Sequence, residues 1–206
     1  MTLIKVCGIT NETDALAAVE AGADALGFNF YPPSPRFIPP EQARMIIDRL
    51  PRTVMSVGVF VNEPSPESVR SLALRAGVKA VQLHGDESPA YCSELSDFFV
   101  IKTFAVGEDF DQNQILLYQV DAIMLDARDD KLRGGTGRVA NWAIAREVAE
   151  HSAHMFLAGG LSAENVEEAI RKVKPYAVDA CSGLEDSPGI KSSVKMRSFV
   201  ETAKRC

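Results

Sequence analysis

The sequence lacks the features that would tie it to a metal, a membrane or a nucleic acid. Its four cysteines and three histidines are scattered over 206 residues without a Cys-x-x-Cys pair, so a zinc site is not expected. No run approaches the roughly 20 apolar residues of a membrane span, and the chain begins with no secretory signal. The net charge is −6, with no Lys/Arg block for a nucleic acid. We therefore expect a cytoplasmic protein with reduced thiols.

What the sequence does contain is eight short, nearly continuous apolar runs that alternate with helical patterns. Such runs are typical of parallel strands covered on both faces. Eight parallel strands predict an α/β fold, a single-domain (β/α)8 TIM barrel over residues 1–206. A doubly wound open sheet is the alternative, but the loop after the first run has no G-x-G-x-x-G fingerprint. The predicted strands are Leu3–Cys7, Ala25–Phe30, Val54–Val61, Ala80–Leu83, Phe99–Phe104, Ala122–Asp126, Met155–Ala158 and Ala177–Ala180.

Capping residues predict where the helices lie. Pro40 suits a first helical position, and Ser65 and Gly77 suit the two ends of the next helix. Further helices are expected to begin at Ser88 and Ser162, to lie around 109–118, where the pattern is weakest, and to span Ser193–Lys204. Two long loops remain, a Pro-rich one over 31–40 and a glycine-rich, mobile one over 129–139.

A thiol and a carboxylate end two of the predicted strands. Cys7 closes the first strand and Asp126 the sixth, and in a βα barrel the carboxyl ends of the strands share the ligand-binding face. Facing each other across a pocket, they could move a proton from one atom to another. Burial would keep Asp126 protonated as a general acid. The alternatives are a small buried hydrophobe for Cys7, and a helix cap or ion pair for Asp126.

Small residues after the last two strands indicate an anion site. Gly159 and Gly160 follow the seventh strand, and Ser182 and Gly183 follow the eighth. Barrels often bind phosphate with these two loops and a short extra helix, because glycines let backbone N–H groups approach an anion. Tight turns alone would also explain either glycine pair. Two such loops on adjacent units make phosphate binding the preferred interpretation.

Three further side chains are candidates for orienting a substrate. Arg36, fixed among prolines, could clamp a carboxylate in bidentate fashion, although a solvated loop residue is the commoner fate of arginine. His84 ends the fourth strand, where a structural or substrate-orienting role is preferred over a catalytic one. Asp179 lies within the eighth strand, and a ligand hydroxyl is one of its possible partners.

Together the motifs resemble the phosphoribosylanthranilate isomerase family of tryptophan biosynthesis, over essentially the whole chain. The resemblance implies a cofactor-free Amadori rearrangement of N-(5-phosphoribosyl)anthranilate to the 1-deoxyribulose phosphate. By position, Cys7 matches the family's general base, Asp126 its general acid, and Arg36 the residue facing the anthranilate carboxylate. The matching segments are Lys5–Thr10, Ser34–Arg36, Gln82–Gly85, Leu125–Asp126, Gly134–Gly137, Leu157–Leu161 and Ser182–Glu185.

The chain departs from the family pattern at three places. Ala127 stands where a small hydroxyl residue is frequent, Cys181 where a Ser is common, and Lys191-Ser192 where Lys-Asp is common. The alternatives are another phosphosugar isomerase or epimerase on the same scaffold, and a non-catalytic phosphometabolite-binding protein. The sugar isomerases of histidine biosynthesis tend to use an Asp in place of Cys7, and a binder would not need Cys7, Asp126 and Arg36 together. A monomer is preferred over a dimer, because the chain makes a complete barrel by itself.

Overall fold

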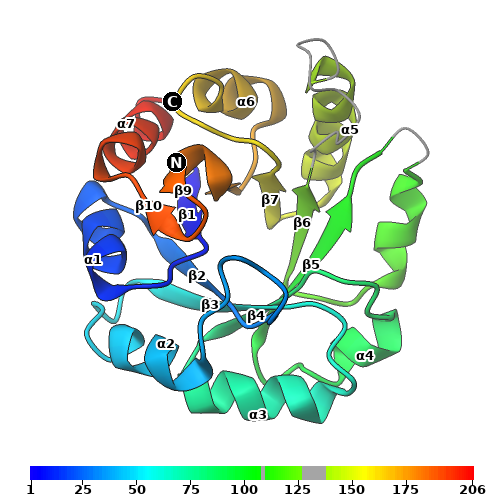
Figure 1. Ribbon diagram of the computed structural model, residues 1–206. Helices are drawn as coiled ribbons and strands as arrows, with labels where there is room; N and C mark the ends of the chain where they lie inside the picture. The colour runs from blue at the N-terminus through cyan, green and yellow to red at the C-terminus, as the bar shows by residue number, and fades with distance from the viewer. Residues whose placement is uncertain (108–109, 127–137) are drawn as a thin grey trace.

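Eight parallel strands close into a barrel in the computed structural model, which describes residues 1–107, 110–126 and 138–206. The strands are arranged in chain order, and β8 returns to pair with β1, with Ile4 opposite Val178 (Figure 1). The predicted TIM barrel is therefore confirmed. The strands are β1 (Leu3–Cys7), β2 (Ala25–Asn29), β3 (Met55–Phe60), β4 (Ala80–Leu83), β5 (Phe99–Ala105), β6 (Ala122–Asp126), β7 (Met155–Ala158) and β8 (Ala177–Ala180).

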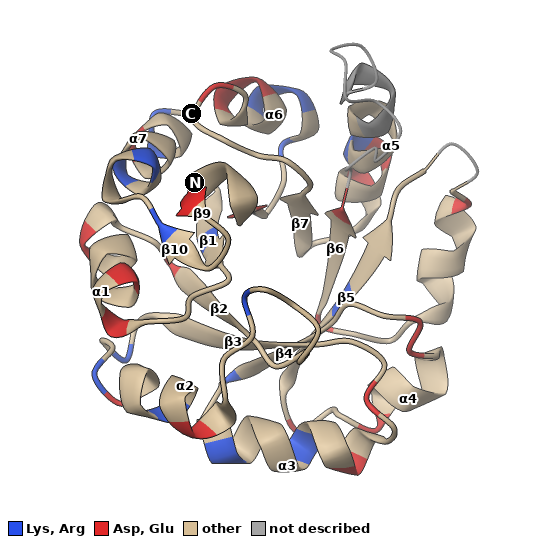
Figure 2. Cartoon of the chain, viewed as in Figure 1, with Lys and Arg blue, Asp and Glu red and all other residues tan. Residues whose placement is uncertain are grey.

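The helices form a ring outside the strands (Figure 1). Charged residues of both signs are spread over the part of this ring that the structure describes, and no helix there is basic along its described length (Figure 2). The helical elements are α1 (Glu12–Ala21), α2 (Pro40–Ile47), α3 (Pro66–Ala76), α4 (Pro89–Ser93), the 3-10 helix η1 (Gln112–Leu117), α5 (Arg138–His151), α6 (Val166–Val173), the 3-10 helix η2 (Ser182–Leu184) and α7 (Ser193–Lys204).

The capping residues predicted most of the helix ends correctly. The Ser65 hydroxyl accepts a hydrogen bond from the Ser68 N–H at the start of α3, and Gly77 closes that helix at φ 71°. The helices predicted at Pro40, Ser88 and Ser193 also begin there.

Two helix predictions are corrected by the structure. Helix α6 begins at Val166 rather than at Ser162, because the Ser162 N–H donates to the Asn165 side chain in a turn that precedes the helix. The segment expected around 109–118 forms a 3-10 helix over Gln112–Leu117, and residue 109 lies outside the described residues. The glycine-rich loop motif at 134–137 lies outside them as well.

The inside of the barrel changes from apolar to polar along its axis. Side chains alternate between the two faces of a strand, so every second residue points inward. The amino-terminal part of the interior is apolar and includes Ala80, Ala122, Met124 and Ala177. Further along three of these strands the next inward positions are polar, at Gln82, Asp126 and Asp179, so the carboxyl end of the barrel presents functional groups.

A small hairpin that the sequence pattern did not predict follows η2. Strand β9 (Glu185–Ser187) pairs with β10 (Ile190–Lys191) in antiparallel fashion, with Lys191 opposite Glu185. In Figure 1 this hairpin lies beside β1 at the end of the barrel nearest the viewer, and the loop from β2 to α2 lies over the same end. Two connections thus meet above the polar end of the interior.

Candidate active site

A cavity of about 230 Å³ opens at the carboxyl ends of the strands, and every predicted site residue lines it. Residues from units one to four and six to eight line it, which agrees with the face where barrels bind ligands. The predicted residues that line it are Cys7, Arg36, His84, Asp126, Gly159, Gly160, Asp179, Ser182 and Gly183, and the lining also includes Asn29, Gln82 and Cys181.

The floor of the cavity carries a buried ion pair between β1 and β8. Lys5 and Asp179 are register partners, and Lys5 Nζ lies 2.8 Å from Asp179 Oδ1. Burial by itself would lower the pKa of Lys5, but the charges of Asp179 and Cys7 raise it above its ordinary value. The ammonium group therefore stays charged directly below the cavity. Asp179 has Lys5 as its partner, and contact of Asp179 with a ligand stays a prediction.

Cys7 lies above that ammonium group as a buried thiol. Its side-chain hydrogen bond with Cys181 lowers the pKa of Cys7 to about 7, with burial acting against it and Lys5 assisting. The same hydrogen bond raises the pKa of Cys181. Cys181 Sγ also lies 4.0 Å from Glu185 Oε1, to which it can donate. A Cβ at Gly27 would lie 2.6 Å from Cys7 Sγ, so glycine is required there for the thiol to fit. The thiol of Cys7 therefore ionises more easily than an ordinary buried thiol.

Asp126 faces the imidazole of His84. The distance from Asp126 Oδ2 to His84 Nε2 is 3.8 Å, and a Gln82 side-chain N–H contacts His84 Nδ1 at 2.8 Å. Burial lowers the pKa of His84 below its ordinary value although Asp126 opposes this, so the ring is neutral. The contact with Gln82 fixes the orientation of the ring beside Asp126.

The burial expected for Asp126 is corrected by the structure. Its side chain is 27% exposed, because it stands at the last residue of β6, where the strand opens into the cavity. The carboxyl group is therefore half-buried and can be reached by a ligand.

Arg36 is held by a carboxylate rather than solvated. Its Nε and one Nη donate to the two oxygens of Glu185 at 2.8 and 2.7 Å, and this pairing raises the pKa of Arg36. Glu185 also accepts from Lys191 Nζ at 3.0 Å. The Pro-rich loop after β2 is thereby tied to the hairpin after β8. The interpretation of Arg36 as an ordinary surface residue is wrong.

The two loops predicted to bind an anion meet in space. Gly159 and Gly160 adopt φ of 99° and 65°, a region that favours glycine. A Cβ at Gly183 would collide with the carbonyl oxygen of Leu161, so this position brings the loops after β7 and β8 into direct contact. The short η2 helix follows β8, as in phosphate-binding barrels. Phosphate binding itself stays a prediction.

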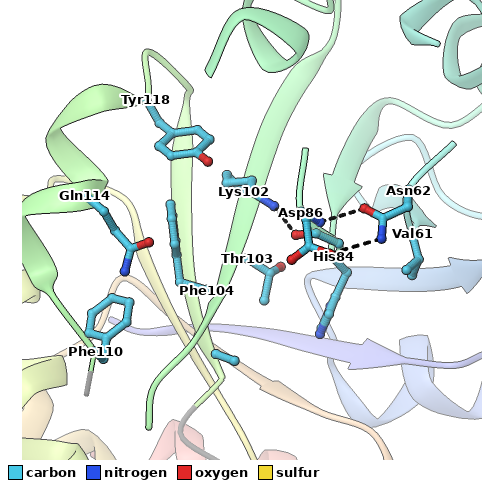
Figure 3. Close-up of a pocket in the computed structure, with 12 residues that line it drawn as sticks. Val61, Asn62, His84, Asp86, Lys102, Thr103, Phe104, Phe110, Gln114 and Tyr118 are labelled. Atoms are coloured by element: carbon cyan, nitrogen blue, oxygen red, sulfur yellow. Dashed lines mark hydrogen bonds between the residues drawn. The ribbon is translucent and has the colours of Figure 1, made fainter. Parts of the chain in front are cut away.

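A second cavity, of about 520 Å³, shares His84 with the first (Figure 3). Its polar side chains bond to the surrounding loops: Lys102 Nζ donates to Gly85 O at 2.6 Å and to Glu87 Oε2 at 2.8 Å, and Asn62 bonds to Asp86. Figure 3 shows Phe104, Phe110 and Tyr118 on the other side. These contacts fix the loop after β4 and therefore the position of His84.

Sequence reasoning missed part of the network around the predicted residues. Lys5 and Gln82 stand two residues before Cys7 and His84, so the period of two along a strand would have placed them on the same face. Glu185 and Lys191 meet only because the hairpin pairs them, and no local pattern indicates that contact.

The described part of the chain offers neither a metal site nor a membrane-spanning helix. Within residues 1–107, 110–126 and 138–206, no three His, Cys, Asp or Glu side chains gather where they could hold a metal ion. Among the helices described there, none has the length and hydropathy needed to cross a membrane.

The fold and the site define a TIM-barrel enzyme with a thiol, a carboxyl group and glycine-rich loops around one cavity. The sequence model of the N-(5'-phosphoribosyl)anthranilate (PRA) isomerase family matches residues 4–202. The N-(5'-phosphoribosyl)anthranilate isomerase of Trichlorobacter lovleyi is 49% identical over 204 residues, covering 99% of this chain and 98% of the relative. The chain therefore belongs to the phosphoribosylanthranilate isomerase family.

Solved structures agree with this assignment. The phosphoribosylanthranilate isomerase of Thermotoga maritima superposes with a TM-score of 0.92 at 42% identity, with both chains fully covered. A family structure in complex with reduced 1-(o-carboxyphenylamino)-1-deoxyribulose 5-phosphate has a TM-score of 0.89 at 41% identity, also with full coverage. A third contains monomers generated from the dimeric T. maritima isomerase. Both assembly states thus occur among relatives, and a monomer of this chain stays a prediction.

Proposed function

We propose that this protein catalyses the Amadori rearrangement of N-(5-phosphoribosyl)anthranilate to 1-(2-carboxyphenylamino)-1-deoxyribulose 5-phosphate, the tryptophan-biosynthetic step that its family membership implies. The observation that carries the proposal is the shared cavity. Cys7 from β1 and Asp126 from β6 line it together with Arg36 and the two glycine-rich loops. An acid, a base and two anion-binding groups are what a substrate with a ring oxygen, a carboxylate and a phosphate requires.

Asp126 acts as the general acid in the first step. Its proton goes to the furanose ring oxygen, the C1–O bond breaks, and the nitrogen lone pair forms the Schiff base. His84 stands 3.8 Å from the carboxyl group as a neutral imidazole.

Cys7 acts as the general base in the second step. It removes the proton from the sugar C2, the C2–H electron pair forms the C1–C2 double bond of an enolamine, and this tautomerises to the ketone. A thiol whose pKa is lowered ionises more readily near neutral pH, which suits a general base. The charged Lys5 ammonium below it stabilises the thiolate.

Two sets of binding groups that line the cavity orient the substrate between acid and base. Arg36 binds the anthranilate carboxylate, and the backbone N–H groups of the loops at Gly159–Gly160 and Ser182–Gly183 bind the phosphate. Together they favour a molecule that carries both a carboxylate and a phosphate.

The test is turnover of phosphoribosylanthranilate, followed by the change in anthranilate fluorescence, with the ketone carbon of the product identified by NMR. Wild type is expected to convert the substrate. The Cys7→Ala, Asp126→Asn double variant serves as the matched control, because it keeps Arg36 and the phosphate loops. It is expected to bind the product without turnover. Wild-type protein that binds the substrate and releases it unchanged would establish the non-catalytic binding function instead.

A further inference from the structure

The bond between Arg36 and Glu185 uses only one side of the guanidinium group. Glu185 accepts from Nε and from one Nη, which together form the side-on pair of donors. A guanidinium group has five N–H donors, and its two Nη atoms form a second, end-on pair. No described residue accepts a hydrogen bond from the other Nη, and Arg36 lines the catalytic cavity. The end-on pair is the one that a ligand carboxylate can use.

The side chain of Glu185 is buried, and its carboxylate is hydrogen-bonded within the protein. Its side chain is 5% exposed, and Oε1 accepts from Lys191 Nζ at 3.0 Å and from the Gly189 N–H at 3.2 Å. Burial would raise the pKa of Glu185, but its bonds to Arg36 and Lys191 lower it, so the group stays ionised. A carboxylate fixed by three groups can fix the arginine in turn, through two parallel bonds.

The charges of this cluster also matter for an incoming anion. Arg36 and Glu185 alone would be neutral together and would not attract a carboxylate at a distance. Lys191, whose side chain is fully buried, adds a second positive charge and leaves the trio with a net charge of +1. One carboxylate is then matched by one positive charge.

We propose that Glu185 is a positioning residue that holds Arg36 by its side-on donors so that the end-on donors face the carboxylate of the substrate, with Lys191 supplying the compensating charge. This inference rests on the proposed function for the identity of the carboxylate. It adds a function for the hairpin β9–β10, which brings Glu185 and Lys191 beside Arg36 across the end of the barrel.

Positioning and simple charge make opposite predictions for Glu185→Gln. The substitution removes a negative charge, so electrostatics alone would tighten the binding of a carboxylate. Loss of positioning would weaken it, because the second pair of donors no longer has a fixed direction. We expect weaker binding, by about 10-fold, which is the lower end of the range for a hydrogen bond to a charged group.

The assay is calorimetric binding of two probes, reduced 1-(o-carboxyphenylamino)-1-deoxyribulose 5-phosphate and the same compound without its carboxyl group. Glu185→Gln should raise Kd for the first probe and leave the second within about 2-fold. In turnover it should raise KM much more than it lowers kcat. Lys195→Met is the matched control and should change neither probe, because Lys195 bonds to the backbone oxygen of Glu185 and not to its carboxylate.

Two results would overturn the proposal. Tighter binding of the carboxylate probe by Glu185→Gln would show that the charge of Glu185 only opposes the ligand, and equal losses for both probes would show a purely structural effect. If Glu185→Gln does not fold, Arg36→Lys decides, because lysine keeps the charge but cannot use two pairs of donors. Undiminished preference for the carboxylate probe in Arg36→Lys would refute positioning. Absence of wild-type turnover would refute the proposed reaction, while these binding data would still test Glu185.

Discussion

Removing the Cys181 thiol should make Cys7 a weaker acid. In the structure the hydrogen bond from Cys181 is the largest influence on the Cys7 thiol and lowers its pKa to about 7. Cys181→Ala deletes the donor and leaves the burial that opposes ionisation, so the pKa of Cys7 must rise. Cys181→Ser keeps a hydroxyl donor at the same place and should leave the pKa near its present value.

The size of the effect follows from the strength of a single hydrogen bond. A hydrogen bond to a charged group is worth about 1.5–3 kcal/mol, and one pKa unit corresponds to about 1.4 kcal/mol. The ionisation midpoint of Cys7 should therefore move upward by about one to two pH units in Cys181→Ala. At pH 7 the ionised fraction of Cys7 would then fall from about one half to between about 10% and 1%.

The assay is the pH dependence of iodoacetamide alkylation, with the Cys7 peptide followed by mass spectrometry so that the exposed Cys206 does not contribute. The midpoint of the rate profile is the quantity to compare, because the intrinsic reactivity of a thiolate rises with its pKa. Wild type and Cys181→Ser should give midpoints near 7. A Cys181→Ala midpoint equal to that of wild type, or below it, would refute the assignment of Cys181 as the donor.

Three further outcomes are expected. Cys7→Ser and Asp126→Asn should each lower kcat by ~100-fold or more, which is the usual effect of removing a positioned base or acid, with smaller changes in KM. A near-normal kcat in either variant would show that the substituted residue has no part in the mechanism. Lys5→Met leaves Asp179 buried without its partner and should lower the free energy of unfolding, measured by urea denaturation, by about 3–5 kcal/mol. The double variant that combines Lys5→Met with Asp179→Asn should recover part of this loss. Dialysis against EDTA should leave kcat unchanged, because side chains perform both proton transfers; activity that EDTA abolishes and a divalent ion restores would contradict this.

The strands and most helix ends could be predicted from the sequence because their causes are local. An apolar run of five residues, a Ser before a Pro, or a Gly after the last turn acts within a few residues of itself. Ser162 shows the limit of such reasoning. Its type suits a helix cap, but the Asn165 side chain accepts from its N–H in a turn that displaces the helix start to Val166.

The residues that line the candidate site could be predicted from the sequence, but the residues that they contact could not. The alternation of strands and helices by itself determined that Cys7, His84 and Asp126 end strands on one face of a barrel. Only the tertiary structure decided what touches them, because the closing register of β1 on β8 places Cys181 near Cys7 and Lys5 on Asp179. In the same way, Arg36 meets a carboxylate 149 positions away only after the barrel has closed. A local pattern fixes the direction of a side chain, whereas its charge environment depends on residues that folding brings from the other end of the chain.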